Sequence, residues 1–370
     1  MRTGKGSIIG SPLFARLLFS GLLLAGLLFA GGCSVLPEPP GDSIYKTPPQ
    51  STEPTDSPTV SLSPSPEPTD TPPAEPTDMP SLNPEPPEDT GAPYAAAGQM
   101  EIIVYDMGKA DAILILTENH AIMIDTGENK NGRPFIDDLH RRGVTEIDVL
   151  IITHFDKDHV GGAGEIVNNF EVREVFVPDY GKSSKPYDRF ISAMDDAGLE
   201  YQALTGQESI VLDGVEFTIY PALREYHDFR IDGDEEDDEY DGEDGGEGDG
   251  GSDLSDNDFS LVIRAVHGNN DFLFAGDAIA GRLADLLATK DITDREYDFL
   301  KVPHHGRYNR NSEEFIQAIS PAYAVITDSS DDPADERVLS ALAETGAVVF
   351  SSQNGDVYCV SDGETLKVTQ

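Results

Sequence analysis

Residues 153–162 read THFDKDHVGG and place four side chains that can bind a metal within six positions: His154, Asp156, Asp158 and His159. The apolar run at 147–153 is typical of a buried strand. Isolated charges are costly to bury, so side chains at the end of such a strand either face solvent or hold cations. The two glycines that follow allow a tight turn into a helix, expected at 160–169. The stretch therefore predicts a metal site.

The charge of the chain limits its partners. Of 370 residues, 69 are acidic and 25 basic, which gives a net charge of -44. Nucleic acids and anionic lipids carry the same sign of charge, so this balance disfavours a nucleic-acid partner without excluding it. The only two cysteines, Cys33 and Cys359, lie far apart, which argues against a disulfide framework. We expect Cys359 to be a small buried hydrophobe, and no protein partner can be inferred.

The first 32 residues have the pattern of a secretory signal, with basic residues before an apolar stretch at 17–30 and small residues before Cys33. Residues 30–33 (AGGC) are similar to a bacterial lipobox, with Ala30 where Leu is usual. We expect residues 1–32 to be a lipoprotein signal peptide and Cys33 to be lipidated. The protein would then be extracytoplasmic and anchored to the bacterial cell membrane. An ordinary signal peptide and an uncleaved signal anchor are the alternatives.

Residues 33–98 are rich in Pro, Ser, Thr and Glu and poor in apolar side chains. No core can then offset the entropy lost on ordering, so we expect a disordered linker that acts as an extended spacer. The folded domain is expected at 99–370. Within it, residues 232–256 are almost entirely Asp, Glu and Gly and are expected to be a disordered acidic insertion.

Short apolar runs and helical patterns alternate from residue 99 onward. Strands are expected at 101–106, 111–117, 121–124, 147–153, 172–177, near 201 and 209, and at 215–220, 259–266, 271–275, 299–302, 322–327, 348–350, 357–360 and 365–368. Helices are expected at 133–142, 160–169, 187–197, 278–289, 312–319 and 334–345. Strand runs flanked by helices favour an α/β fold with two sheets between helical layers, a four-layer αββα sandwich.

The pattern HxDxDH at 154–159 resembles the signature of the metallo-β-lactamase-like hydrolase superfamily, with Asp156 where a second His is usual. Further motifs follow in the family's order: DMGKAD (106–111), IDTG (124–127), NDFSLV (257–262), LFAGD (273–277) and LKVPHHG (300–306). The variant with Asp156 looks like the hydrolase domain of the competence protein ComEC family. The membrane-channel part of that family has no counterpart in this sequence, so we expect no DNA transport by this chain alone.

The resemblance implies two divalent metal ions, Zn or Mn. His154 and Asp156 would serve the first ion, and Asp158 and His159 the second, with Asp277 between them. Asp158 and Asp277 would also be the catalytic carboxylates. One of His304 and His305 would complete the second position, with the His before Gly favoured, and the remaining ligand falls at Asn257 or Asp258. The carboxylate of Asp156 makes the site richer in oxygen, which moves the expectation from zinc alone toward zinc or manganese.

Several other polar residues are expected beside the ligands or the substrate: Asp106, Asp111, Asp125, Asn257, Ser260 and Lys301. Asp125 would orient a ligand His, Asp106 and Asp111 could simply form turns, and Lys301 could either contact an anionic substrate or pack in its strand. Asp277 could also cap the helix that follows it. Four histidines lie outside every motif and are expected at the surface: His120, His140, His227 and His267.

These features predict a metal-dependent hydrolase that uses a metal-activated water on a phosphodiester or related ester, with nuclease activity included. The acidic charge instead favours a small-molecule ester or lactone, and a β-lactam is the weakest substrate class. The non-enzymatic alternative is a surface or DNA-uptake accessory module that keeps the fold. Near-complete ligands argue against that alternative.

Overall fold

The computed structural model describes residues 94–222, 230–232 and 254–370. The expected signal peptide, Cys33, nearly all of the expected linker and His227 lie outside these residues. Within the described ranges, no helix combines the length and the apolar character that a membrane crossing requires.

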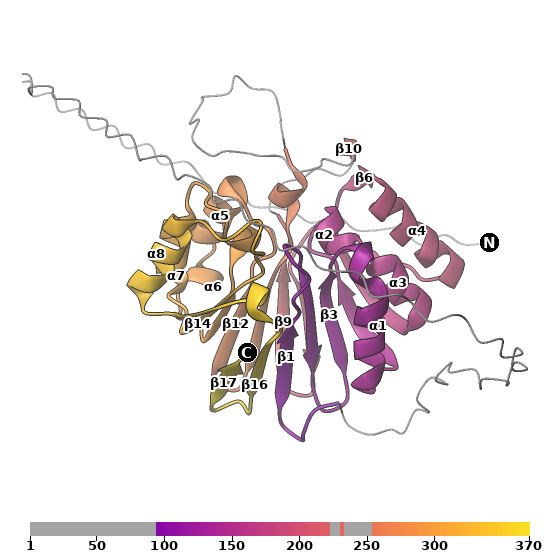
Figure 1. The fold of residues 1–370 in the computed structure, drawn as a ribbon, viewed down its shortest axis with the longest axis horizontal. Coiled ribbons are helices and arrows are strands. Elements are labelled where there is room, and N and C mark those ends of the chain that lie inside the picture. Colours follow the sequence, from indigo (N-terminus) through magenta and orange to yellow (C-terminus); the bar gives the residue numbers. More distant parts are fainter. Residues whose placement is uncertain (1–93, 223–229, 233–253) are drawn as a thin grey trace, which may run out of the picture. The chain divides into compact units, whose positions relative to one another are not determined.

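Two sheets lie face to face, with helices on the outer face of each (Figure 1). The eight strands of the first sheet are, in spatial order, β17 (Leu366–Thr369), β16 (Val357–Ser361), β1 (Met100–Val104), β2 (Ala112–Leu116), β3 (Ala121–Thr126), β4 (Glu146–Ile151), β5 (Glu171–Pro178) and β7 (Gln202–Leu204). The seven strands of the second are β15 (Val348–Ser351), β14 (Tyr323–Ile326), β13 (Phe299–Lys301), β12 (Asn270–Phe274), β11 (Val262–His267), β9 (Val215–Tyr220) and β8 (Glu208–Leu212). A separate parallel pair is formed by β6 (Gly181–Ser183) and β10 (Arg230–Asp232).

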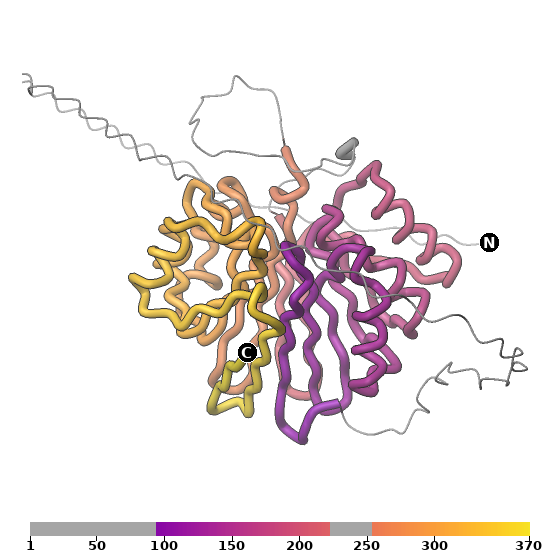
Figure 2. The backbone as a smooth tube through the Cα atoms, in the orientation of Figure 1, coloured from indigo at the N-terminus to yellow at the C-terminus, as the bar shows by residue number. Residues whose placement is uncertain are grey.

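The helices divide between the two sheets, as the backbone trace also shows (Figure 2). The first sheet carries α1 (Gly132–Arg141), α2 (Lys157–Val160), α3 (Ala163–Asn169) and α4 (Lys185–Ala197). The second carries α5 (Ala280–Ala288), α6 (Lys290–Thr293), α7 (Ser312–Ile319) and α8 (Glu336–Thr345). Short 3-10 turns are η1 (Asn129–Asn131), η2 (Asp256–Phe259), η3 (Pro303–Gly306) and η4 (Ser352–Asn354).

Strand β4 shows how the sequence produces these layers. Its Val149 and Ile151 pack in the core between the sheets, whereas Leu150 and the next even-numbered residue, Ile152, pack under the helices of the first sheet. Successive side chains of a strand point to opposite faces, so a strand covered on both faces is almost continuously apolar. The two sheets with outer helices that the sequence predicts are confirmed.

Two expectations about burial have different outcomes. Cys359 is buried in β16, as predicted. His267 at the end of β11 is also buried, and its Nδ1 lies 2.9 Å from Ser361 Oγ. The prediction that His267 is a surface residue is therefore wrong, because an apolar strand with a polar end residue can satisfy that residue internally.

Two residues at the ends of the expected insertion, 232–256, lie in described elements. Asp232 is the last residue of β10, and Asp256 begins η2 with its side chain buried. Composition alone does not distinguish a buried Asp such as Asp256 from a solvated one. Residues 233–253 lie outside the described part of the chain.

Asp213 links the two sheets at their hairpin ends. It lies between β8 and β9 with a positive φ of 47°, and its carboxylate accepts hydrogen bonds from Thr117 Oγ1 (2.8 Å) and from Asn119 N (2.6 Å) and Nδ2 (3.0 Å) in the β2–β3 turn. Burial alone would raise the pKa of Asp213, but these hydrogen bonds outweigh it and lower the pKa well below its usual value. The ionised carboxylate therefore stabilises the fold.

Asp213→Ala should lower the free energy of unfolding by about 1–2 kcal/mol, because it removes these hydrogen bonds and places Ala in a left-handed conformation. Asp213→Asn should lose less, since Asn keeps an acceptor and tolerates positive φ. A carboxyl whose pKa is lower in the folded than in the unfolded protein stabilises the fold at pH values above its unfolded pKa, and this stabilisation is lost as the pH falls. The stability difference between the wild type and Asp213→Asn should therefore shrink below about pH 4. Urea unfolding at pH 7 and pH 3.5 measures both effects, and equal stability of all three proteins at pH 7 would contradict them.

Candidate metal centre

The polar motifs meet where the parallel strands of both sheets end. In the first sheet, β3 and β4 are parallel, and the HxDxDH motif follows β4. In the second sheet, β12 and β13 are parallel, Asp277 follows β12, and His305 lies in η3 directly after β13. Carboxyl ends of parallel strands in α/β sheets meet at one edge, which is where such proteins place their sites. The site is therefore assembled from loops of both sheets.

Two glycines after the motif are required by space. A Cβ on Gly161 would lie 2.2 Å from the carbonyl oxygen of Lys157, and one on Gly162 would lie 2.4 Å from that of Thr126. Both contacts are far too short for any side chain. The glycines thus let α2 pack against the end of β3, which brings His159 to the site.

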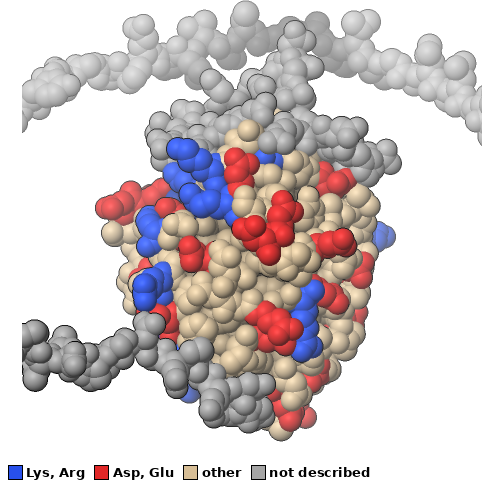
Figure 3. Space-filling view, turned by 90° about the vertical axis from the view of Figure 1, so that its right-hand side faces the viewer, with Lys and Arg blue, Asp and Glu red and all other residues tan. Residues whose placement is uncertain are grey.

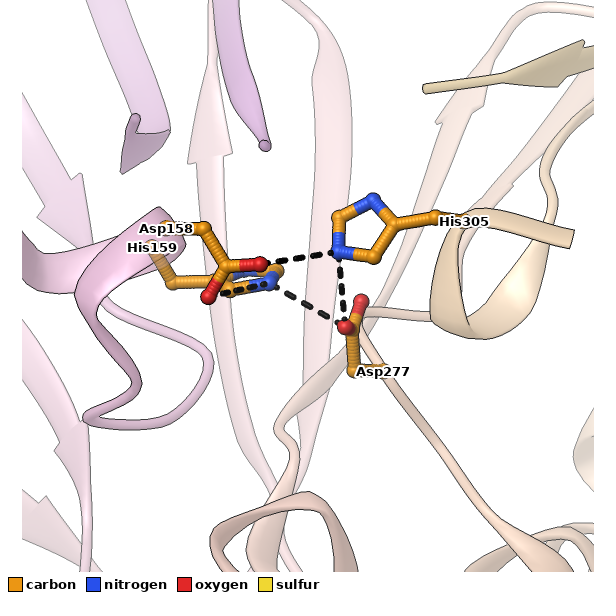
Figure 4. A group of neighbouring side chains, drawn as sticks. All are labelled: Asp158, His159, Asp277 and His305. Atoms are coloured by element: carbon orange, nitrogen blue, oxygen red, sulfur yellow. Dashed lines mark ion pairs between the residues drawn. The ribbon is translucent and has the colours of Figure 1, made fainter. Parts of the chain in front are cut away.

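Four side chains converge at this edge: Asp158, His159, Asp277 and His305 (Figure 4). One ligand atom from each lies within 4.8 Å of all the others. His305 Nε2 is 2.9 Å from Asp277 Oδ2 and 3.3 Å from Asp158 Oδ2, and His159 Nε2 is 3.2 Å from Asp277 Oδ2. Two carboxylates and two imidazoles in this arrangement form a donor set suited to a divalent cation.

Each imidazole of the cluster is held by a neighbouring residue at its Nδ1 atom. His159 Nδ1 lies 2.8 Å from Asp125 Oδ2, and His305 Nδ1 lies 2.9 Å from Thr327 Oγ1. The Nε2 atoms of His154, His159 and His305 are buried and form no hydrogen bond, although carboxylate oxygens of Asp156, Asp158 and Asp277 lie close to them. A histidine held through one nitrogen with the other left open is the arrangement found around protein-bound metals. The residues present therefore fit a cation.

The ionisation of the cluster is set by burial and by mutual attraction. Burial alone would raise the pKa values of Asp158 and Asp277, but His159 and His305 outweigh it, and both carboxyls have pKa values well below the usual range. Burial would lower the pKa of His305, but Asp277 and Asp158 raise it to about 8. Asp277 and Asp125 likewise raise the pKa of His159 despite its burial. A cation that binds here competes with protons on the imidazoles, while the carboxylates stay ionised.

Lys301 neutralises the carboxylates beneath the cluster. It is fully buried, its ammonium contacts Asp111, lies 3.2 Å from Asp277 Oδ1 and donates to the Gly276 carbonyl oxygen at 3.0 Å. A lysine in this position has no access to a substrate. Of the two expected roles for Lys301, the structural one fits, and the substrate contact does not.

The two adjacent histidines of η3 differ in role. Both have positive φ values, 50° for His304 and 52° for His305, which is a strained backbone for non-glycine residues and is typical of functional sites. Only His305 belongs to the four-residue cluster. His304 Nδ1 instead lies 3.0 Å from Asn309 Nδ2, and burial lowers the pKa of His304 to about 4, so it is neutral at pH 7.

The expected first metal position, at His154 and Asp156, contains a lysine. His154 Nε2 lies 3.3 Å from Asp156 Oδ2, but Asp156 Oδ1 also lies 2.6 Å from the ammonium of Lys182. The same ammonium lies 3.0 Å from Asp256 Oδ2. His154 and Asp156 are therefore adjacent to the four-residue cluster but share their space with a lysine.

The remaining expected residues take other positions. The carboxylate of Asp258 accepts the backbone N–H of Ser255 in a capping box at η2, and the buried Oδ1 of Asn257 has no hydrogen-bond partner. The Ser260 hydroxyl accepts from the backbone N–H of Asp277 at 3.2 Å. Asp106 accepts from Gly108 N and so forms a turn, as one of its two expected roles requires.

Several residues at the site had no sequence signal. Lys182, Asp256, Tyr180 and Thr327 lie in loops or short elements without a motif, and their neighbours are far away in the chain. Asp256 lies one position before the NDFSLV motif, and this proximity is the only feature of the sequence that points to the site for any of the four.

The comparisons agree with this geometry. Residues 105–326 match the family model described as "Metallo-beta-lactamase superfamily". The chain belongs to this superfamily.

The chain is 23% identical over 280 residues to "ComE operon protein 3" of Bacillus subtilis (strain 168), with 70% of this chain and 32% of the relative covered. It is 24% identical over 241 residues to "Recombination protein 2" of Haemophilus influenzae, with 63% and 25% covered. The chain thus spans a third or less of the relatives' own length. The metallo-beta-lactamase fold protein YhfI from Bacillus subtilis aligns with a TM-score of 0.42 and 9% identity over 69% of this chain and 98% of that one.

Lys301→Met should lower the free energy of unfolding of this superfamily domain by about 3–5 kcal/mol, because it leaves the carboxylates of Asp111 and Asp277 buried without their counter-charge. Added Zn²⁺ or Mn²⁺ should restore part of the loss, since a cation beside Asp277 replaces the missing charge. Lys367→Met removes the same charge from an exposed position on β17 and is the matched control. Thermal unfolding with and without metal measures the effect; equal midpoints for the two variants would contradict it.

Proposed function

We propose that this chain is an extracytoplasmic, membrane-anchored, metal-dependent hydrolase that acts on a phosphodiester or related ester. The proposal rests mainly on one observation. In a metallo-β-lactamase superfamily domain, the open Nε2 atoms of His159 and His305 converge with the carboxylates of Asp158 and Asp277. A non-catalytic module would gain nothing from burying these four groups together, because their burial is costly without a cation.

Those four residues would hold the ion. Oxygen and imidazole donors suit Zn²⁺ or Mn²⁺. When bound, such a cation would polarise a substrate oxygen and lower the pKa of water. The pKa values of Asp158 and Asp277 are held low, so both are weak bases and are better suited to hold positive charge than to accept a proton.

The chain's own residues supply the fixed geometry. Asp125 and Thr327 hold the two imidazoles in place, so no reorganisation is needed when a ligand arrives. The side chain of Asp277 is only 4% exposed, whereas those of Asp158 and Asp156 are 16% and 29% exposed. A substrate would therefore approach from the side of the HxDxDH loop.

The substrate class is supported by the relatives and limited by charge. The relatives include "Recombination protein 2" and "Competence protein ComA" of Neisseria gonorrhoeae, and these names favour a phosphodiester, although the chain covers only part of each relative. The net charge of -44 favours a small or weakly charged ester over long nucleic acid. On the face of the molecule in Figure 3, acidic and basic side chains are interspersed and no broad basic area is visible.

The hydrolase should cleave bis-p-nitrophenyl phosphate when purified with Mn²⁺ or Zn²⁺, and Asp158→Ala and His159→Ala should each reduce the rate at least about 100-fold, because each removes a ligand group. Asp137→Ala, on the exposed face of α1, is the control and should keep full activity. Bound metal should be measured in the same samples.

The outcomes separate the candidate functions. Bound metal without cleavage of the diester would contradict the phosphodiester assignment and support a small-molecule ester or lactone. A chain that binds no metal would contradict the hydrolase assignment and leave the non-catalytic surface or DNA-uptake module.

The membrane anchor is proposed on the sequence pattern that ends at Cys33. In a bacterial host, Cys33→Ser should move the protein from the membrane fraction to the soluble fraction, because the acyl chains that would bind it to the bilayer cannot be attached. Fractionation followed by immunoblotting measures this shift. A variant that stays in the membrane fraction to the same extent as the wild type would contradict lipidation at Cys33.

A further inference from the structure

The side chain of Lys182 is buried beside the metal centre. The residue lies in β6, where it pairs with Ile231 of β10, and it is 2% exposed. Its ammonium lies 2.6 Å from Asp156 Oδ1 and 3.0 Å from Asp256 Oδ2. Asp256 in turn accepts a hydrogen bond from the hydroxyl of Tyr180. The lysine is therefore held by buried partners and is not a surface side chain that happens to reach the site.

This position coincides with the first metal position, which the sequence resemblance assigns to His154 and Asp156. The second position is formed by four residues, Asp158, His159, Asp277 and His305, and Lys301 reaches only Oδ1 of Asp277, whose Oδ2 faces the imidazoles. The first position has only His154 and Asp156 from the motif. At the first position, one oxygen of Asp156 is already bound to an ammonium. The donors thus fit one divalent cation, and they do not fit a second.

Electrostatics explains why a second ion would be excluded. An ammonium within hydrogen-bond distance of a carboxylate offsets part of that carboxylate's attraction for a further cation. A divalent cation bound to the same carboxylate would lie within a few ångströms of the ammonium, in a buried environment where like charges repel more strongly than in water.

Resting on the proposed function, we infer that the Lys182 ammonium takes the place of the first cation, so that the chain binds one divalent ion and not two. The replacement of a second His by Asp156 in the motif agrees with this role, because a carboxylate pairs with an ammonium and a neutral imidazole does not.

The test is the number of ions bound by the full chain. The protein is dialysed to equilibrium against Mn²⁺ alone or Zn²⁺ alone, and bound metal is measured by mass spectrometry. The wild type should bind about one ion per chain. Lys182→Met should raise the number toward two, since Asp156, Asp256 and the open Nε2 of His154 lose their competing cation. Lys157→Met removes the same charge from an exposed residue of the motif and should leave the number at one.

Each result decides the matter. Two ions on the wild type would overturn the inference and leave the proposed function standing, whereas no ion on the wild type would overturn both. One ion on both the wild type and Lys182→Met would show that Lys182 does not exclude the second ion. If Lys182→Met does not fold, the shorter, uncharged Lys182→Gln replaces it, and the wild-type number alone still separates one ion from two.

Discussion

The main physical constraint on this domain is the burial of like charges at one edge of two sheets. Asp111, Asp125, Asp158 and Asp277 lie close together and are largely removed from water. Burying carboxylates in this way is unfavourable unless positive charge or hydrogen-bond donors compensate. The ammonium of Lys301 offsets the negative charge of Asp111 and Asp277, and the imidazoles also lie against the carboxylates. The remaining negative potential faces the open Nε2 atoms, where a cation would lie.

The buried polar groups of the site lie at the ends of strands. Each parallel strand that reaches the edge delivers at least one polar group, and its apolar body packs between the sheets or under the helices. Polar chemistry and apolar packing are therefore separated along each strand, and not mixed within the core. Backbone strain at His304 and His305 is tolerated only because the surrounding packing fixes η3.

Much of the layer structure and half of the metal centre follow from local sequence. The period of the apolar residues predicts strands such as β4, and the HxDxDH pattern places Asp158 and His159 beside one another. The positions of Lys182 and Asp256 could not be predicted, because their contacts depend on chain segments that are distant in sequence and carry no motif. His267 shows the same limit in the core, where only the partner Ser361 explains its burial.

The two sheets are connected at both ends of the sandwich. Asp213 joins them at the hairpin end, and at the other end the backbone N–H of Leu261 in the second sheet's chain segment donates to Thr153 of the first at 2.9 Å. A bound ion would add a further connection, because its ligands come from both halves of the chain. The ion would then crosslink the two sheets. The stiffness of the sandwich would depend on metal occupancy, and so would the rate at which its two halves separate.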